Sequence, residues 1–193
     1  IYMLSAQDFS CQEVYYLGHY KGSIAVPPFA WQGYILVAVN GGDYCDLFVL
    51  KHAPNGLGME LVQVITRGTN GPVTSPMQKF GRHMLIAADN GEIRILELNP
   101  TEEQNPVRKF AEDRFENKSS QPAFVLTEGS NLWIAGRGIS RFRLKRTLGK
   151  IERDEIVEHG DDFLAPLIKL DDNIMHVRRR QDSGMLSVSL VEG

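Results

Sequence analysis

Apolar residues occur along this chain in short runs that are separated by polar or glycine-rich turns. A run with a proline at its centre occurs four times, at Pro27, Pro76, Pro122 and Pro166. These prolines are 49, 46 and 44 residues apart. A turn, a second apolar run, a second turn and a third apolar run follow each of them. The pattern therefore predicts four copies of one structural unit.

The runs within each unit have the length and punctuation of β-strands. The second runs are 34–39, 84–88, 132–135 and 174–177, and the third runs are 47–50, 93–98, 139–144 and 186–191. More polar fourth runs close the first three units at 61–65, 107–110 and 155–157. Residues 93–98 and 140–145 largely alternate apolar with polar side chains, as a half-buried strand does.

Two local signals add detail to this strand prediction. Asn90-Gly91, between two apolar runs, predicts a tight hairpin with a primed turn, because such a turn needs positive φ. A competing signal lies at residues 101–104, Thr-Glu-Glu-Gln, which resemble a helix capping box before 107–116. Pro106 would interrupt that helix, so a strand is favoured there.

Four strands in a unit of roughly 45 residues are typical of the blades of a β-propeller. We therefore expect an all-β fold, a β-propeller of about four blades of four antiparallel strands, complete or part of a larger ring. The prolines suit the innermost strand, whose free edge tolerates a missing N–H. Residues 1–193 would form a single propeller segment. Its parts are the tail of a preceding blade, 1–21, and the units 22–70, 71–118, 119–162 and 163–193.

The ends of the chain leave two interpretations of ring closure. The fourth unit stops after its third strand, and Glu13–Leu17 resembles an orphan fourth strand. Either these two strands pair and close a ring of four blades, or the chain belongs to a larger ring. The run Tyr2–Ser5 resembles the third strand of an earlier blade and favours the larger ring. The first residue is Ile1, so we expect a fragment or processed product of a longer protein.

One stretch resembles a known family. Residues 91–98, Gly-Glu-Ile-Arg-Ile-Leu-Glu-Leu, follow an Ile86-Ala87-Ala88-Asp89 strand as in the pyrroloquinoline-quinone-like (quinoprotein dehydrogenase-like) propeller repeats. The resemblance extends over residues 22–193 as architecture and is close in the second unit. It implies a propeller and favours an extracytoplasmic or periplasmic location. The family's Thr-Gly-x-x-x-Trp segment is missing, since Trp31 is expected in a turn and Trp133 in a second strand.

Composition narrows the classes of function. The chain has 21 Lys and Arg against 24 Asp and Glu, a net charge of −3, and a pI near 6.0. A dedicated nucleic-acid binder would be strongly basic, and a disordered chain would have fewer than the 42% apolar residues found here. No apolar run is long enough to predict a membrane span. Cys11 and Cys45 are too few for a disulfide framework and are expected to be unpaired.

The candidate chemistry is sparse. The five histidines show no ligand spacing, and the 40–46 loop lacks the pattern of a calcium loop, so we expect no metal. The sequon at 117–119 has meaning only in a glycosylating compartment. One basic feature suggests a patch for an anion or an acidic partner. Its residues are Arg137, Arg141 and Arg143, followed by Lys145 and Arg146, and Arg178, Arg179 and Arg180. Nearby acids can neutralise it, which favours a solvated strand face; they are Glu152, Asp154, Glu155 and Glu158.

These observations support two hypotheses of function. The first is a non-catalytic propeller scaffold that binds a protein or ligand, with no cofactor and no catalytic residue. Its partner would be another protein, the rest of its own chain, or a second copy that completes a ring, and not a nucleic acid. The alternative is a fragment of a quinone-dependent dehydrogenase, as the resemblance implies. That class needs a calcium site and a set of polar quinone ligands, and the sequence places neither.

Overall fold

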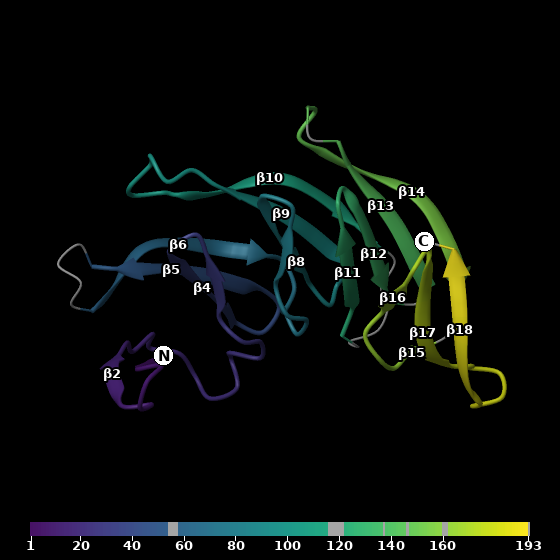
Figure 1. The fold of residues 1–193 in the computed structure, drawn as a ribbon, viewed down its shortest axis with the longest axis horizontal. Helices are drawn as coiled ribbons and strands as arrows, with labels where there is room; N and C mark the ends of the chain where they lie inside the picture. The colour runs from purple at the N-terminus through teal and green to yellow at the C-terminus, as the bar shows by residue number, and fades with distance from the viewer. Residues whose placement is uncertain (54–57, 116–121, 137, 146, 160–161, 193) are drawn as a thin grey trace.

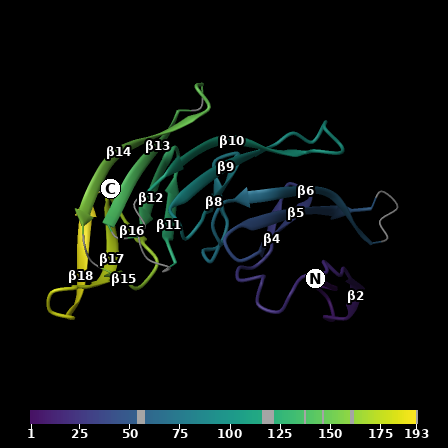
Figure 2. The same cartoon turned by 180° about the vertical axis from the view of Figure 1, so that it is seen from behind.

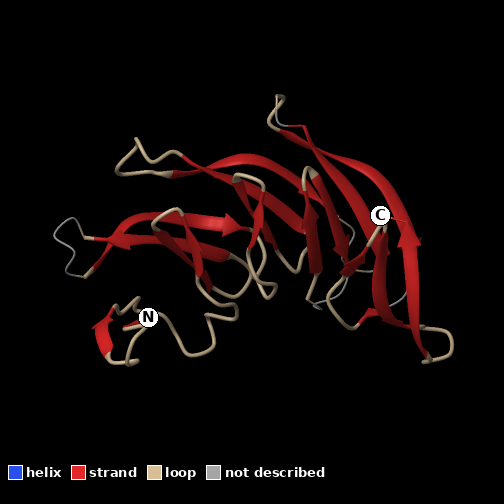
Figure 3. Ribbon diagram, in the orientation of Figure 1, coloured by secondary structure: helices blue, strands red, loops and turns tan. Residues whose placement is uncertain are grey.

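The structure is a computed structural model that describes residues 1–192, except 54–57, 116–121, 137, 146 and 160–161. The described residues form strands, turns and loops, with no helix among them (Figure 3). The prediction of an all-β chain is confirmed. The strands make four antiparallel four-stranded sheets and one short N-terminal hairpin.

The first three sheets each consist of four consecutive strands that pair in chain order. The first sheet contains β3 (Phe29–Trp31), β4 (Tyr34–Asn40), β5 (Cys45–His52) and β6 (Met59–Thr69). The second contains β7 (Gln78–Phe80), β8 (His83–Ala87), β9 (Glu92–Leu98) and β10 (Val107–Arg114). The third contains β11 (Phe124–Glu128), β12 (Asn131–Ala135), β13 (Gly138–Lys145) and β14 (Lys150–His159). The competing helix is excluded, because its residues lie in β10.

The fourth sheet is organised differently. Its central strand β17 (Asn173–Arg179) pairs along its whole length with β18 (Leu186–Glu192). The opposite edge of β17 is shared by two short strands, β15 (Asp162–Phe163) and β16 (Ile168–Leu170). Together these two strands fill the first position of the unit, and Pro166 lies between them. Strand β18 therefore occupies the third position.

The four sheets follow one another along a curved row (Figures 1 and 2). The last strands of the first three sheets, β6, β10 and β14, lie along the convex side, and β3, β7 and β11 form the opposite edges. The first and fourth sheets stand at the two ends of the row. Closure of the row into a ring is not detected.

Three hydrophobic cores hold the row together, one between each pair of consecutive sheets. The first contains Leu36 and Leu47 of the first sheet with Ile86 of the second. The next two join the second sheet to the third and the third sheet to the fourth. Strand β8 is buried along its whole length because its side chains alternate between two of these cores.

The landmark prolines lie just before the inner strands rather than inside them. Strand β3 begins two residues after Pro27, and β7 begins two residues after Pro76. Strands β11 and β16 begin two residues after Pro122 and Pro166. A proline has no N–H to donate to a ladder, so the paired segment starts beyond it.

Two residue-level predictions were wrong. Trp31 was expected in a turn, yet it ends β3 and is 4% exposed in the first core. A primed turn was expected at Asn90-Gly91, but only Gly91 has positive φ, at 88°. The amide of Gly91 donates to the carbonyl of Ala88 (3.0 Å), and the connection spans four residues between β8 and β9. A longer hairpin loop needs positive φ at one position only.

The N-terminal hairpin consists of β1 (Tyr2–Leu4) and β2 (Cys11–Val14), which pair with each other. It lies beside the first sheet, where Oε1 of Glu13 accepts a hydrogen bond from the amide of Met59 (2.6 Å). Pairing of the orphan strand with the end of the fourth unit is therefore not observed. The pairing of β1 with β2 is the arrangement expected of the third and fourth strands of a preceding unit.

Candidate functional site

A groove of about 320 Å³ lies along the inner edges of the second and third sheets. Its lining residues come from the segments that lead into β7, β11 and β16. They are Thr74, Ser75, Pro76, Gln78, Pro122, Ala123, Phe124, Val125 and Pro166. Three of them are the landmark prolines of three successive units. We call this feature the inner groove.

Hydrogen bonds between the two sheets hold the inner groove in shape. The side-chain amide of Gln78 donates to the carbonyl of Val125 (2.7 Å), and the hydroxyl of Ser75 donates to the carbonyl of Ala123. In the opposite direction, the hydroxyl of Thr127 donates to the carbonyl of Lys79 (3.0 Å). Main-chain groups at the inner edges are thereby paired with side chains of the neighbouring sheet, which sets the spacing of the two groove walls.

One end of the inner groove is polar. The hydroxyl of Thr74 donates a hydrogen bond to Oδ1 of Asp89, at 2.6 Å. Asp89 is 9% exposed, and burial raises the pKa of its carboxyl, whereas the bond from Thr74 acts in the opposite direction. The groove thus offers apolar proline, phenylalanine and valine surface with one hydroxyl–carboxyl pair at its margin.

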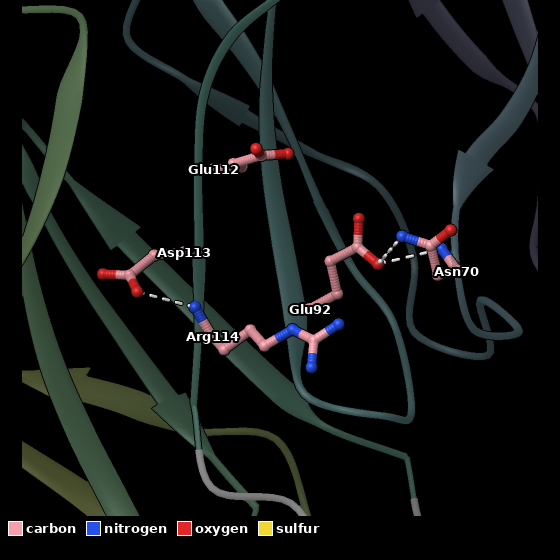
Figure 4. A pocket seen from close by; sticks show the side chains of 5 residues that line it. All are labelled: Asn70, Glu92, Glu112, Asp113 and Arg114. Atoms are coloured by element: carbon pink, nitrogen blue, oxygen red, sulfur yellow. Dashed lines mark hydrogen bonds between the residues drawn. The ribbon is translucent and has the colours of Figure 1, made fainter.

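A second, polar pocket of about 370 Å³ opens where the first and second sheets meet. It is lined by Asn70, Glu92, Glu112, Asp113 and Arg114 (Figure 4). Oε2 of Glu92 accepts hydrogen bonds from the backbone amide (2.8 Å) and the side-chain amide (3.1 Å) of Asn70. These bonds tie the start of β9 to the turn that follows β6.

The charged groups of this polar pocket bond mainly to the protein itself. Glu92 is 4% exposed, and its Oε1 accepts a hydrogen bond from Nε of Arg94 at 2.5 Å. A hydrogen bond from Lys109 lowers the pKa of Glu112. Because these carboxylates are already engaged, we give the polar pocket a structural role, in which it fastens one sheet to the next.

The predicted arginine patch is spread over two sheets. Nη2 of Arg141 and Nη2 of Arg143, both on β13, lie 3.2 and 3.1 Å from Oδ2 of Asp154 on β14. Nζ of Lys145 lies 3.6 Å from Oε2 of Glu152. Two of the acids that the sequence analysis expected to neutralise the patch are therefore in place. Arg137, Arg146 and the side chains of Glu155 and Glu158 lie outside the described residues.

The second half of the patch is in the fourth sheet. Nε of Arg178 donates to the hydroxyl of Ser187 (3.2 Å), and Nη2 of Arg179 lies 3.3 Å from Oδ2 of Asp162. Arg180 is exposed in the turn that follows β17. Both halves make bonds within their own sheets, so anion or partner binding by these arginines stays a prediction.

The residues were also compared with the needs of a quinone and its calcium ion. Among the residues that the structure describes, no group of three or more His, Cys, Asp or Glu side chains could hold a metal ion. Cys11 is exposed and Cys45 is buried, and both are free, as predicted. These residues do not fit the quinone–calcium centre that the resemblance implies, and we derive no reaction step from it.

The two tryptophans pack between sheets although the family's tryptophan segment is missing. Trp133 of β12 is 2% exposed in the core between the third and fourth sheets. Nζ of Lys169 lies 5.8 Å from the centre of its ring. Trp31 lies in the core between the first and second sheets. An aromatic contact between neighbouring sheets is thus made from other positions of the unit.

Comparisons with known proteins add no name. No family model matches the chain, and a search of the curated proteins finds no match to it. The structure supports a coarser statement than the resemblance does, which is an all-β protein of repeated four-stranded antiparallel sheets. In the described residues, no helix is long and apolar enough to cross a membrane.

The sequence analysis missed the inner groove. It recognised the prolines as markers of the repeat but did not ask where they meet. In a row of stacked units, equivalent positions lie on one side of the row, so the markers of neighbouring units are brought close together. That recurrence was the available signal. Gln78 and Phe124 gave no separate signal.

Proposed function

We propose that the chain is a β-propeller type of scaffold without catalytic function and that it binds a partner protein or ligand in the inner groove. The observation that carries this proposal is the meeting of three repeat markers, Pro76, Pro122 and Pro166, around one cavity. Sheets that repeat around an axis characteristically present such a surface at their inner edges.

The chemistry of the inner groove indicates what it would bind. Ligand sites are concave and mostly apolar, with a few polar groups that set orientation. Here the proline rings, Phe124 and Val125 supply the apolar surface, and Thr74 and Gln78 supply polar atoms. A volume of about 320 Å³ suits a single aromatic ring system or one large side chain of a partner.

The test uses indole as a defined apolar probe in an NMR titration. A ligand of about nine heavy atoms gains roughly 3 kcal/mol at ordinary ligand efficiency, which corresponds to millimolar binding. We expect saturable chemical-shift changes at the amides of Gln78 and Val125. In the Pro76→Trp variant, an indole ring fills the groove from an exposed position, and these changes should disappear.

The chain offers a matched control, Pro27→Trp. Pro27 is the equivalent exposed marker of the first unit and does not line the groove. This variant should bind indole as the unmodified protein does. Shift changes scattered over the surface, or equal binding by Pro76→Trp and Pro27→Trp, would contradict the proposed site.

A further inference from the structure

Strand β18 has the position of an interior strand and the surroundings of an edge strand. In the other three sheets, the third strand is covered on its outer side by β6, β10 or β14. Strand β18 is the third strand of the fourth sheet, and in the described residues it pairs only with β17. Its outer side is therefore an open edge.

The direction of the backbone groups on β18 follows from one hydrogen bond. The amide of Arg180 donates to the carbonyl of Met185 at 2.9 Å, so the main-chain groups of residue 185 face β17. Successive residues of a strand point their N–H and C=O groups to opposite sides. The main-chain groups of Leu186, Val188 and Leu190 consequently point to the open edge.

The same three residues also carry exposed apolar side chains. Leu186, Val188 and Leu190 are 68, 66 and 60% exposed. Their alternation places them on one face of the sheet, which continues through Ile168 and Leu170 on β16 according to the strand register. Both the backbone and the side chains of this edge are thus available for pairing.

The edge also lacks the features by which proteins protect exposed strands. Charged side chains and prolines on an edge strand discourage pairing with another molecule. The outermost strand β10 reads Val-Arg-Lys-Phe-Ala-Glu-Asp-Arg, and β14 begins Lys-Ile-Glu-Arg-Asp. In contrast, residues 185–191 read Met-Leu-Ser-Val-Ser-Leu-Val, with no charge and no proline.

The sequence of β18 indicates which molecule fits this edge. Residues 186–190, Leu-Ser-Val-Ser-Leu, read the same in both directions. We propose that a second copy of the chain pairs antiparallel along β18, with a twofold axis at Val188. Val188 then faces its own symmetry mate, Leu186 faces Leu190 of the other copy, and serine faces serine on the opposite side. A twofold contact of this kind is self-complementary and closed.

This inference does not depend on the proposed binding function of the inner groove. In the paired arrangement, the outward N–H and C=O groups of Leu186, Val188 and Leu190 bond to those of the partner copy. The apolar side chains of the two copies meet across the junction and leave water. The two fourth sheets become one continuous sheet.

The first test is the mass of the chain in solution, measured by sedimentation over a range that reaches about 100 μM. Small interfaces commonly have dissociation constants in the micromolar range. We expect a monomer–dimer equilibrium in the unmodified protein. In Val188→Lys, two like charges would lie directly opposite each other, and the protein should be monomeric throughout. The control is Leu148→Lys, which alters another exposed leucine and should still dimerise.

The second test reads the register. In a Cys11→Ser background, Val188→Cys should form a disulfide-linked dimer on mild oxidation. Residues of a hydrogen-bonded antiparallel pair have Cα atoms about 5.5 Å apart, within the range that a disulfide spans. Leu186→Cys should not form it, because its counterpart lies about four residues along the strand, roughly 13 Å away.

A monomeric unmodified protein at all concentrations would overturn the proposal. So would a dimer that survives Val188→Lys with the same dissociation constant, or equal cross-linking through Val188→Cys and Leu186→Cys. Far-UV circular dichroism of Val188→Lys must match that of the unmodified protein. If it does not, the disulfide experiment, in which the side chain stays small, decides the question.

Discussion

Asp89 illustrates how burial controls the charge of a single side chain at the margin of the inner groove. Its carboxyl is 9% exposed, and desolvation raises its pKa above the ordinary value. A buried carboxyl favours its neutral form, so ionisation weakens the folded state more than the unfolded state. The hydrogen bond from Thr74 at 2.6 Å moderates the effect without removing it.

Replacement of Asp89 by asparagine should therefore change the pH dependence of stability. Because the folded-state pKa is raised, the stabilising contribution of Asp89 is complete at low pH and is lost as the pH rises through that pKa. The variant lacks this loss, and its amide oxygen can still accept the bond from Thr74. We expect its unfolding free energy to gain on that of the unmodified protein by on the order of 1 kcal/mol between about pH 4 and pH 8.

Urea unfolding at several pH values measures this difference. Asp172→Asn, an exposed aspartate in the turn before β17, is the control and should show no such trend. The account of Asp89 fails if Asp89→Asn loses stability relative to the unmodified protein as the pH rises.

Single residues were the hardest features to predict from the sequence. Trp31 was expected in a turn because the glycine at position 33 marks one, but the turn begins only after the tryptophan. Asn90-Gly91 was correctly assigned to a hairpin, but its turn type depends on the number of residues between the strands. That number is set by pairing with neighbouring strands, which the local pattern does not show.

At the scale of elements, side chains of one sheet complete the hydrogen bonding of the next. Nε2 of Gln63 on β6 donates to the carbonyl of Val107 on β10 (2.8 Å), and Oε1 of Gln63 accepts from the amide of Val107 (3.0 Å). Asn40 makes the same double bridge to the main chain of Val73. Each amide satisfies a donor and an acceptor that the sheet ladder leaves open.

Gln63→Ala should destabilise the protein because it leaves both main-chain groups of Val107 unpaired in a mostly buried position. Val107 is 2% exposed, and a buried polar group without a partner costs about 1–3 kcal/mol. We expect the midpoint of urea unfolding to fall accordingly. Gln104→Ala, at an exposed loop position, is the matched control. Equal midpoints for the two variants would show that the bridge contributes nothing.

The elements themselves were largely predictable, because buried strands leave continuous or alternating apolar runs. The second and third runs of every unit correspond to observed strands. The outer strands β6, β10 and β14 extend beyond their apolar runs, since their charged ends pair through the backbone rather than through side-chain burial. The inner strands were misplaced by a few residues because the prolines were expected inside them.

At the scale of the whole molecule, the row of sheets is open and leaves surface uncovered. Its accessible surface is 10533 Å², whereas a compact monomer of this mass would expose about 9,200 Å². The excess is of the order of one small protein–protein interface. Part of it is the apolar edge and face of β18, which stands at one end of the row.

The repeat was predictable from the regular spacing of prolines and runs, but the assembly of the units was not. Spacing shows that equivalent positions recur and leaves open the angle between neighbouring sheets. That angle depends on side-chain packing within the three cores, such as Trp133 against the fourth sheet. The inner groove is a product of this packing and for the same reason was not foreseen.

Small-angle X-ray scattering of the Val188→Lys variant as a monomer tests the central claim most directly, namely that four sheets stack in an open curved row. A compact globule of 193 residues has a radius of gyration of about 16 Å. The open row predicts a clearly larger radius and a pair-distance distribution with a long tail that matches the coordinates. A radius at the compact value with a symmetric distribution would contradict the account.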